Sequence, residues 1–114
     1  MTVKVLGDVD EFIQEVLILE RPQSLVVVDF YATWCEPCKQ FAMTFEVVAN
    51  RLCECRDVKF VKMDVELFYG GIIRDMGIRS VPTTALYIDG KLVDTLSGSV
   101  SESALEEFVT AHLD

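Results

Sequence analysis

The run SLVVVDFYA, residues 24–32, constrains the fold more than any other stretch of the sequence. It is almost continuously apolar and rich in β-branched side chains, whereas a strand with one face in water alternates apolar and polar residues. A run of this kind is typical of a strand that is buried on both faces of a sheet. Such a strand needs other layers on both sides, so the sequence predicts an α/β fold.

The first half of the chain continues this pattern. A short strand is expected at Val3–Leu6, followed by a helix that Asp8 and Glu11 would cap and whose apolar face would include Phe12, Ile13, Val16 and Leu17. The apolar residues Phe41, Phe45, Val48 and Leu52 repeat with the period of a helix. The segment Val58–Val65 then reads as another strand.

The second half predicts a weaker helix, a hairpin and a closing helix. Phe68, Ile72 and Met76 indicate the weaker helix, which Gly70-Gly71 would interrupt. The hairpin is TTALYI and KLVDTL around Asp89-Gly90. The closing helix is expected from about Val100 to Leu113, with Ser99 and Glu102 as its cap pair and Leu105, Phe108 and Val109 facing inwards. The expected order is βαβαβαββα, a mixed sheet with helices on both faces.

Length and charge limit the possible functions. We expect residues 1–114 to form one domain, because the chain has the usual size of one compact unit and shows no repeat or linker. With 10 basic and 19 acidic residues, the formal charge of −9 disfavours nucleic acid and anionic membranes as partners. The acidity serves either solubility or steering towards a basic docking surface. The beginning of the sequence does not resemble a secretory signal, and apolar runs reach only four residues or so, so we expect a cytoplasmic protein.

The four cysteines could hold a metal or carry out redox chemistry, because a cytoplasmic protein keeps its thiols reduced. A zinc site would need Cys35, Cys38, Cys53 and Cys55 to converge on one point. The predicted helix between the two pairs separates them by about 20 Å, at roughly 1.5 Å per residue. We therefore expect no metal site within one chain.

A redox role fits Cys35 and Cys38 better. Cys35 follows a buried strand and precedes a helix, where free backbone N–H groups and the helix dipole favour a thiolate. Cys38, one turn later, is placed to attack a mixed disulfide formed at Cys35. Pro37 suits the first helical turn because it needs no N–H group there, and Trp34 can cover the pair and contact a substrate.

These residues also carry a family resemblance. VVVDFYATWCEPCK closely resembles the thioredoxin active-site signature, and GIRSVPT, residues 77–83, resembles the segment that holds the family's cis-proline. LSGSVSESALEEFV is similar to the family's final strand and helix. The resemblance spans essentially the whole chain and implies the thioredoxin fold, a central mixed sheet flanked by helices on both faces.

The resemblance gives roles to further residues. Asp29 interrupts an apolar strand, so we expect burial to raise its pKa, unless the carboxylate reaches solvent at the strand end. The resemblance implies that Asp29 accepts the proton of Cys38 and that Lys62 moderates this carboxylate. It also implies a cis bond before Pro82, which would leave the Val81 backbone free to pair with an extended substrate peptide. Gly98 would allow close approach of that peptide, or is a plain turn glycine.

Several positions depart from the family pattern. Glu36 replaces the usual glycine and would raise the pKa of Cys35 by about half to one pKa unit through repulsion. Met43 stands where the family commonly has a proline that kinks the helix, and residues 66–76 are a few more than is typical. Cys53 and Cys55 are interpreted as buried or idle thiols, with a regulatory disulfide between them or a dimer link as alternatives. His112 is expected to cap the last helix or face solvent.

The resemblance implies a protein-disulfide reductase that cycles between a Cys35/Cys38 dithiol and disulfide and holds no bound cofactor. An NADPH-dependent thioredoxin reductase would restore the thiols. Peroxiredoxins, ribonucleotide reductase and methionine sulfoxide reductases would be typical recipients, and the protein would be a monomer. Two alternatives stay open at this point, namely a disulfide isomerase or oxidase of the same fold, and a thioredoxin-like binding module whose cysteines are incidental.

Overall fold

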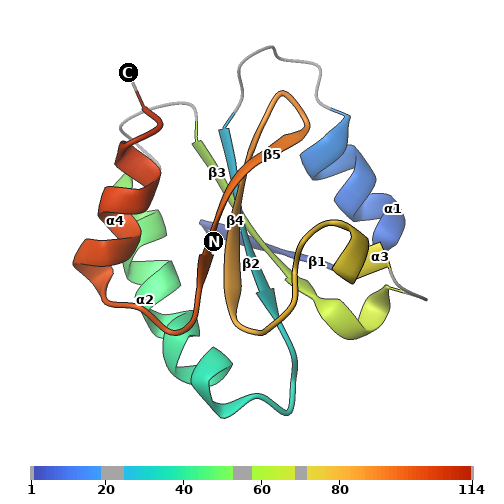
Figure 1. The fold of residues 1–114 in the computed structure, drawn as a ribbon. Coiled ribbons are helices and arrows are strands. Elements are labelled where there is room, and N and C mark those ends of the chain that lie inside the picture. Colours follow the sequence, from blue (N-terminus) through green and yellow to red (C-terminus); the bar gives the residue numbers. More distant parts are fainter. Residues whose placement is uncertain (1, 19–24, 53–57, 69–71, 114) are drawn as a thin grey trace.

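A computed structural model describes residues 2–18, 25–52, 58–68 and 72–113 (Figure 1). Cys53 and Cys55 therefore lie outside the described residues. The strands are β1 (Val3–Leu6), β2 (Leu25–Tyr31), β3 (Val58–Asp64), β4 (Thr83–Ile88) and β5 (Lys91–Ser97). The helices are α1 (Val9–Phe12) with its π-helical continuation η1 (Ile13–Leu17), α2 (Glu36–Leu52), the 3-10 turn η2 (Val65–Leu67), α3 (Ile72–Asp75) and α4 (Glu102–Thr110).

The described strands form one mixed sheet in the order β1-β3-β2-β4-β5. β1, β3 and β2 run parallel to one another, while β4 and β5 are antiparallel to their neighbours. Helices α2 and α4 cover one face of the sheet, and α1 and α3 cover the other (Figure 1). The prediction of a mixed sheet between helical layers is confirmed.

β2 is the central strand, as its composition predicts. Every residue from Leu25 to Phe30 is buried. Leu25 and Val27 belong to a core under α2 and α4 that also holds Phe41, Phe45 and Leu105. The alternate residues Val26, Val28 and Phe30 enter a second core with Phe12, Met63 and Tyr87. Because successive side chains of a strand point to opposite faces, one apolar run supplies both cores.

The first helix begins as predicted but ends differently. The Asp8 carboxylate accepts the Glu11 N–H at 2.8 Å, which caps α1. Leu17 was predicted on the buried face, and this is wrong because its side chain is 37% exposed. The chain widens into a π-helical turn at Ile13, where Ile18 N–H donates to the Ile13 carbonyl at 2.8 Å. A π-helical turn shifts the residues that follow relative to a 3.6-residue period.

The closing helix is shorter than predicted, and its cap residue is different. Ser101, not Ser99, caps α4 by accepting the Ala104 N–H at 3.1 Å. Leu105 and Val109 are buried as expected, and Phe108 packs against the same core. The expected weak helix is reduced within the described residues to the turns η2 and α3.

The long helix α2 is continuous from Glu36 to Leu52, and Met43 in its middle is 73% exposed. The hairpin between β4 and β5 turns at Asp89 and Gly90, which both have positive φ angles of 53° and 79°. Such a turn favours Asp-Gly, since its backbone twist matches that of the flanking strands. The predicted hairpin is therefore confirmed.

Candidate functional site

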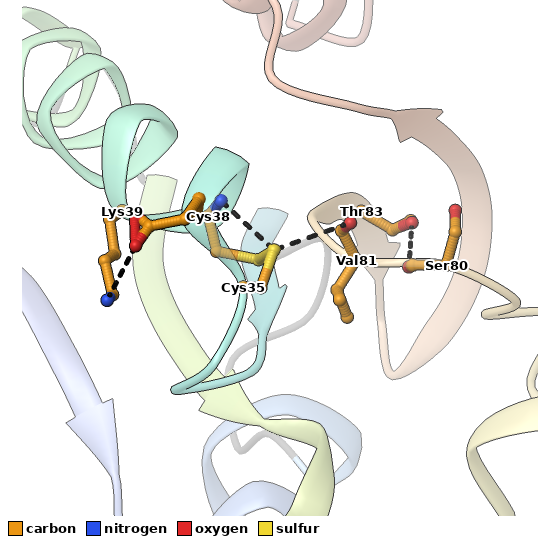
Figure 2. The surroundings of a disulfide bond; sticks show 7 residues. Cys35, Cys38, Lys39, Ser80, Val81 and Thr83 are labelled. Atoms are coloured by element: carbon orange, nitrogen blue, oxygen red, sulfur yellow. Dashed lines mark hydrogen bonds and ion pairs between the residues drawn. A yellow bond between two sulfur atoms is a disulfide. The ribbon is translucent and has the colours of Figure 1, made fainter.

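The two cysteines at the start of α2 are bonded to each other in this structure (Figure 2). Their Cα atoms are 5.2 Å apart, and both residues are buried. The Cys35 carbonyl accepts the Lys39 N–H at 3.3 Å, while the Cys38 N–H donates to the Cys35 Sγ at 3.2 Å. Cys35 thus stands where a serine or aspartate usually caps a helix, with its sulfur in place of the capping oxygen.

The position of Cys35 at the start of α2 favours a negative charge on its sulfur. The first turn of a helix has N–H groups without intrahelical partners and a partial positive charge. In the reduced protein, a thiolate at Cys35 would receive the hydrogen bond that the Sγ now accepts from Cys38. A hydrogen bond and a dipole that favour the anion lower a thiol pKa, and the thiolate is the nucleophile in disulfide exchange.

The side chains around the pair lie at the protein surface. Pro37 is in the first turn of α2, as predicted, and Trp34 is 67% exposed directly before the disulfide. Glu36 is also exposed and lies 3.3 Å from the Lys39 ammonium. The repulsion that we predicted between Glu36 and a Cys35 thiolate is therefore partly balanced by Lys39.

The segment before β4 faces the disulfide from the other side (Figure 2). The Val81 carbonyl oxygen lies 3.8 Å from the Cys35 Sγ, and the Val81–Pro82 peptide bond is cis, as the resemblance implies. The Thr83 hydroxyl donates to the Ser80 carbonyl at 2.7 Å and holds this turn together. The Gly98 N–H donates to the Pro82 carbonyl at 2.8 Å, which ties the end of β5 to the same segment.

Gly98 has a φ angle of 92°, a conformation that residues with a Cβ rarely adopt. A Cβ built there would meet no atom within 4 Å. The backbone conformation alone therefore explains the glycine within this chain, and its surroundings leave open space.

Asp29 is buried in the middle of β2, with 1% of its surface exposed. Neither carboxylate oxygen has a hydrogen-bond partner among the described residues. Burial raises the pKa of Asp29 to about 7, and the nearby Lys62 charge opposes this rise. The prediction of a buried carboxyl with a raised pKa agrees with the structure, and the alternative of a solvent-exposed carboxylate does not.

Lys62 is the neighbour of Asp29 across the β2–β3 ladder. Its ammonium lies 4.4 Å from the centroid of the Tyr31 ring, in a cation–π arrangement. Burial is the main cause that raises the pKa of Tyr31, and the charges of Asp64 and Asp29 add to it.

A small cavity of about 110 Å³ is lined by both Asp29 and Lys62. Helix α2 contributes Ala42, Phe45 and Glu46 to its lining. Ala42 lies one turn after Cys38, so one side of α2 carries both the second cysteine and the wall of this cavity. Sequence reasoning missed Glu46, although its spacing of eight residues from Cys38 places it on that side.

A larger groove of about 680 Å³ adjoins the disulfide. Its lining residues come from three separate segments: Trp34, Val65, Ile73, Arg74, Ile78, Arg79, Ser80 and Val81. Trp34 and Val81 were predicted to contact substrate, but the two arginines were not singled out. The quoted motif GIRSVPT contained Arg79, whereas Arg74 reaches the groove only through the folding of α3.

His112, the single histidine of the sequence, lies outside both hollows. His112 Nδ1 lies 3.1 Å from the Phe108 carbonyl oxygen, within the last turn of the chain, in agreement with the predicted capping role. No three His, Cys, Asp or Glu side chains in the described ranges are grouped so that they could hold a metal ion. Nor does any helix in these ranges have the length and apolar character needed to cross a membrane.

Comparisons with known proteins agree with this geometry. The family model described as Thioredoxin matches residues 4–111. Thioredoxin of Griffithsia pacifica is 37% identical over 90% of this chain and 88% of its own length. Thioredoxin of Malassezia sympodialis is 34% identical over 96% of this chain and 98% of its own length.

Solved structures extend the agreement to the fold. The crystal structure of Malassezia sympodialis thioredoxin matches with a TM-score of 0.79, covering 96% of this chain and 90% of that one. A mutant thioredoxin from Halobacterium salinarum matches with a TM-score of 0.77 at 28% identity, covering 98% of this chain and 91% of that one. The chain therefore belongs to the thioredoxin family, and its Cys35–Cys38 pair makes it a disulfide oxidoreductase with the thioredoxin fold.

Proposed function

We propose that this thioredoxin-family reductase transfers two electrons from Cys35 and Cys38 to disulfides of other proteins, with Cys35 as the attacking thiol. The observation that carries the proposal is the hydrogen bond from the Cys38 N–H to the Cys35 Sγ at the first turn of α2. It favours negative charge on Cys35 and places the second cysteine within bonding distance.

The reaction proceeds in two exchanges. The Cys35 thiolate attacks one sulfur of the substrate disulfide, a mixed disulfide forms, and the other substrate sulfur leaves as a thiolate. The Cys38 thiol then loses its proton and attacks the Cys35 sulfur, and the second substrate thiolate departs. The protein ends as the Cys35–Cys38 disulfide, and the substrate has gained two electrons; its two thiolates become thiols by taking up the equivalent of the Cys38 proton and one proton from water.

Asp29 is the proposed acceptor of the Cys38 proton. A carboxyl with a pKa of about 7 exchanges protons readily near neutrality, which suits a general base. Lys62 faces the same cavity as Asp29 and opposes the effect of burial, so removing Lys62 should raise the pKa of Asp29 further.

The substrate would bind in an extended conformation beside the disulfide. The Val81 carbonyl borders the Cys35 sulfur, and Val81 lies outside β4, so its backbone is available to pair with a substrate strand. Trp34 and Pro37 are exposed next to the disulfide and would offer apolar surface to the substrate. Pro82 and Gly98, which are joined by a hydrogen bond beside Val81, would complete the binding surface.

The proposed electron source is NADPH through a thioredoxin reductase, and the proposed compartment is the cytoplasm. The proposed recipients are disulfide-containing enzymes of the peroxiredoxin, ribonucleotide reductase and methionine sulfoxide reductase types. These assignments follow from family membership and from the need for a donor that returns the disulfide to the dithiol.

An NADPH-coupled assay with a thioredoxin reductase and insulin as the disulfide substrate tests the proposal. Wild type should sustain NADPH oxidation, whereas Cys38→Ser should stop after one exchange because nothing resolves the mixed disulfide. A parallel arm replaces NADPH and reductase by dithiothreitol, so failure of that reductase to recognise the chain is separated from failure of the chemistry. If wild type does not accelerate insulin reduction in either arm, the chain is a binding module and the proposal is rejected.

The isomerase or oxidase alternative is decided by the reduction potential. A value near about −270 mV supports a reductase, whereas a value near about −180 mV supports disulfide isomerisation. Equilibration against glutathione, followed by alkylation of free thiols, gives this value.

A further inference from the structure

We propose that the groove beside Cys35 selects substrate segments that carry acidic side chains next to the target cysteine. The inference deepens the proposed function and rests on it. The lining of the groove combines apolar residues with Arg74 and Arg79, and its described residues include no Asp or Glu. Its occupant would be an extended, partly apolar segment of a substrate protein that carries aspartate or glutamate.

The groove is positioned to receive such a segment. Trp34 precedes Cys35 in the chain, and the Val81 carbonyl lies 3.8 Å from the Cys35 sulfur. Both residues line the groove, so a peptide whose sulfur reaches Cys35 has its neighbouring side chains at the groove entrance. Ile73, Ile78 and Val65 provide the apolar surface further along.

Arg74 and Arg79 differ from most of the other described cations because they form no ion pair with a described acidic side chain. Among the described cations, Lys4, Lys39, Arg51 and Lys59 form ion pairs with acidic side chains. Lys62 lies over the Tyr31 ring. Arg74, Arg79 and Lys91 have no such partner within the part of the chain that the structure describes, and two of these three line the same groove.

This arrangement is unusual in a chain with a formal charge of −9. Acidic side chains outnumber basic ones, yet neither groove arginine is neutralised by one of them among the described residues. A guanidinium group offers a planar pair of N–H donors that fits a carboxylate, so the unpaired arginines are available to an acidic ligand. At physiological salt, exposed charges further than about 8 Å from a ligand are largely screened, so the charges that line the groove count most for a bound segment.

The acidic side chains nearest in the sequence do not line the groove. Glu36, next to Cys35, is paired with Lys39 at 3.3 Å. Glu66 accepts a hydrogen bond from the Thr33 hydroxyl at 3.5 Å, and Asp75 follows Arg74 in α3. Neither side chain lines the groove, and neither is within ion-pair distance of Arg74 or Arg79 among the described residues. The charged side chains that line the groove are therefore both arginines.

Three peptides test the proposal. Each is a homodimeric disulfide of one apolar sequence, with Glu, Gln or Lys at the second position on either side of the cysteine. The reduced protein is mixed with each peptide at about 0.15 M salt, quenched with acid and alkylated, and the Cys35–Cys38 disulfide is quantified by peptide mass mapping. The reaction converts one protein dithiol and one peptide disulfide into one protein disulfide and two peptide thiols.

We expect the Glu peptide to react about three- to tenfold faster than the Gln peptide, the range expected for one or two partly exposed ion pairs. In the double variant Arg74→Gln/Arg79→Gln this ratio should fall to within about twofold of unity. Lys91→Gln is the matched control, because Lys91 is also exposed and has no ion-pair partner among the described residues but lies on β5 away from the groove. Because the Glu-to-Gln ratio is taken within each variant, a change in the rate with the Gln peptide does not affect the comparison, and Lys91→Gln should keep the wild-type ratio. Far-ultraviolet circular dichroism of each variant, with complete formation of its Cys35–Cys38 disulfide under excess oxidised dithiothreitol, shows that fold and thiol chemistry are intact.

Equal rates for the Glu and Gln peptides in wild type would overturn the proposal, as would a Glu preference that survives in the double variant. A Lys peptide that reacts fastest would show that the overall negative charge, not the groove, selects the substrate. If none of the three peptides oxidises the protein, the proposed function fails and the inference fails with it.

Discussion

The buried carboxyl of Asp29 should make the stability of this protein fall as the pH rises. In the unfolded chain the carboxyl ionises with a pKa near 3.8, whereas burial raises the pKa in the folded protein to about 7. Between these values the unfolded state has lost a proton that the folded state retains, so the free energy of unfolding decreases with pH. Above about pH 7 both states are ionised and the decrease ends.

The magnitude follows from the size of the shift. One pKa unit corresponds to about 1.36 kcal/mol, so a shift of about three units gives a total effect of about 4 kcal/mol. More than half of this loss of stability falls between pH 5 and pH 8, where we expect the free energy of unfolding to decrease by about 2–3 kcal/mol. Asp29→Asn has nearly the same shape and cannot ionise, so it should escape this loss.

The assay is urea unfolding of the oxidised protein, followed by far-ultraviolet circular dichroism at pH 5, 6, 7 and 8. We expect the stability difference between Asp29→Asn and wild type to increase by about 2–3 kcal/mol in favour of the variant from pH 5 to pH 8. Subtracting the two proteins removes the contribution of the other titrating groups, which both share. A difference that stays constant across this range would show that the Asp29 carboxyl of the folded protein does not titrate with a raised pKa.

Glu107→Gln is the matched control for loss of one negative charge, since Glu107 is exposed on α4. Its stability difference from wild type should not show the increase expected for Asp29→Asn. If both variants show the same increase, the effect comes from net charge and not from the buried carboxyl.

Three further changes test other parts of the structure. Glu36→Gly should lower the pKa of Cys35 by at most about half a pKa unit, because Lys39 already balances part of the Glu36 charge. The pH dependence of iodoacetamide alkylation measures the Cys35 pKa, and a higher pKa in the variant than in wild type would contradict this expectation. Phe12→Ala should cost about 3–5 kcal/mol of stability, because the Phe12 ring is buried and its centroid lies 5.3 Å from that of the Phe68 ring. A loss of less than about 1 kcal/mol in urea unfolding would contradict a place for this ring in the core. Ser101→Ala should cost about 1 kcal/mol and leave insulin reduction unchanged, whereas the same change at Ser99 should have little effect on stability.

Much of the fold could be predicted from local patterns. The apolar run at residues 24–32 predicted the central strand and its two covering layers, and the four-residue and three-residue spacing from Phe41 to Leu52 predicted the buried side of α2. The predicted burial of Asp29 followed from its place inside that run. These features depend on periods of two and 3.6 residues, which a sequence displays directly.

The patterns failed where local signals compete. Ser99 and Glu102 match a capping box, yet Ser101 caps α4, although the residue three positions after it is alanine. Leu17 is exposed at the end of a π-helical turn, whose spacing differs from the 3.6-residue period that the prediction used. Neither the cap residue of α4 nor the exposure of Leu17 can be predicted from residue spacing alone, because each depends on how the segment packs against the sheet.

The groove was beyond sequence reasoning for a different reason. Trp34, Val65 and the residues from Ile73 to Val81 meet only after β2 and β3 pair and the segment around α3 turns back towards Cys35. Tertiary contacts between such distant segments produce no periodic pattern in the sequence. The lack of an ion-pair partner for Arg74 and Arg79 among the described residues likewise depends on where the acidic side chains lie in the folded chain.

Trapping of the mixed disulfide tests the assigned order of attack most directly. Reduced Cys38→Ser and Cys35→Ser variants are each mixed with one disulfide peptide, quenched with acid and analysed by intact mass and peptide mapping. We expect Cys38→Ser to accumulate one peptide per chain on residue 35 and Cys35→Ser to accumulate none on residue 38. A peptide attached to Cys38 as readily as to Cys35, or to neither, would contradict the claim that the start of α2 activates Cys35.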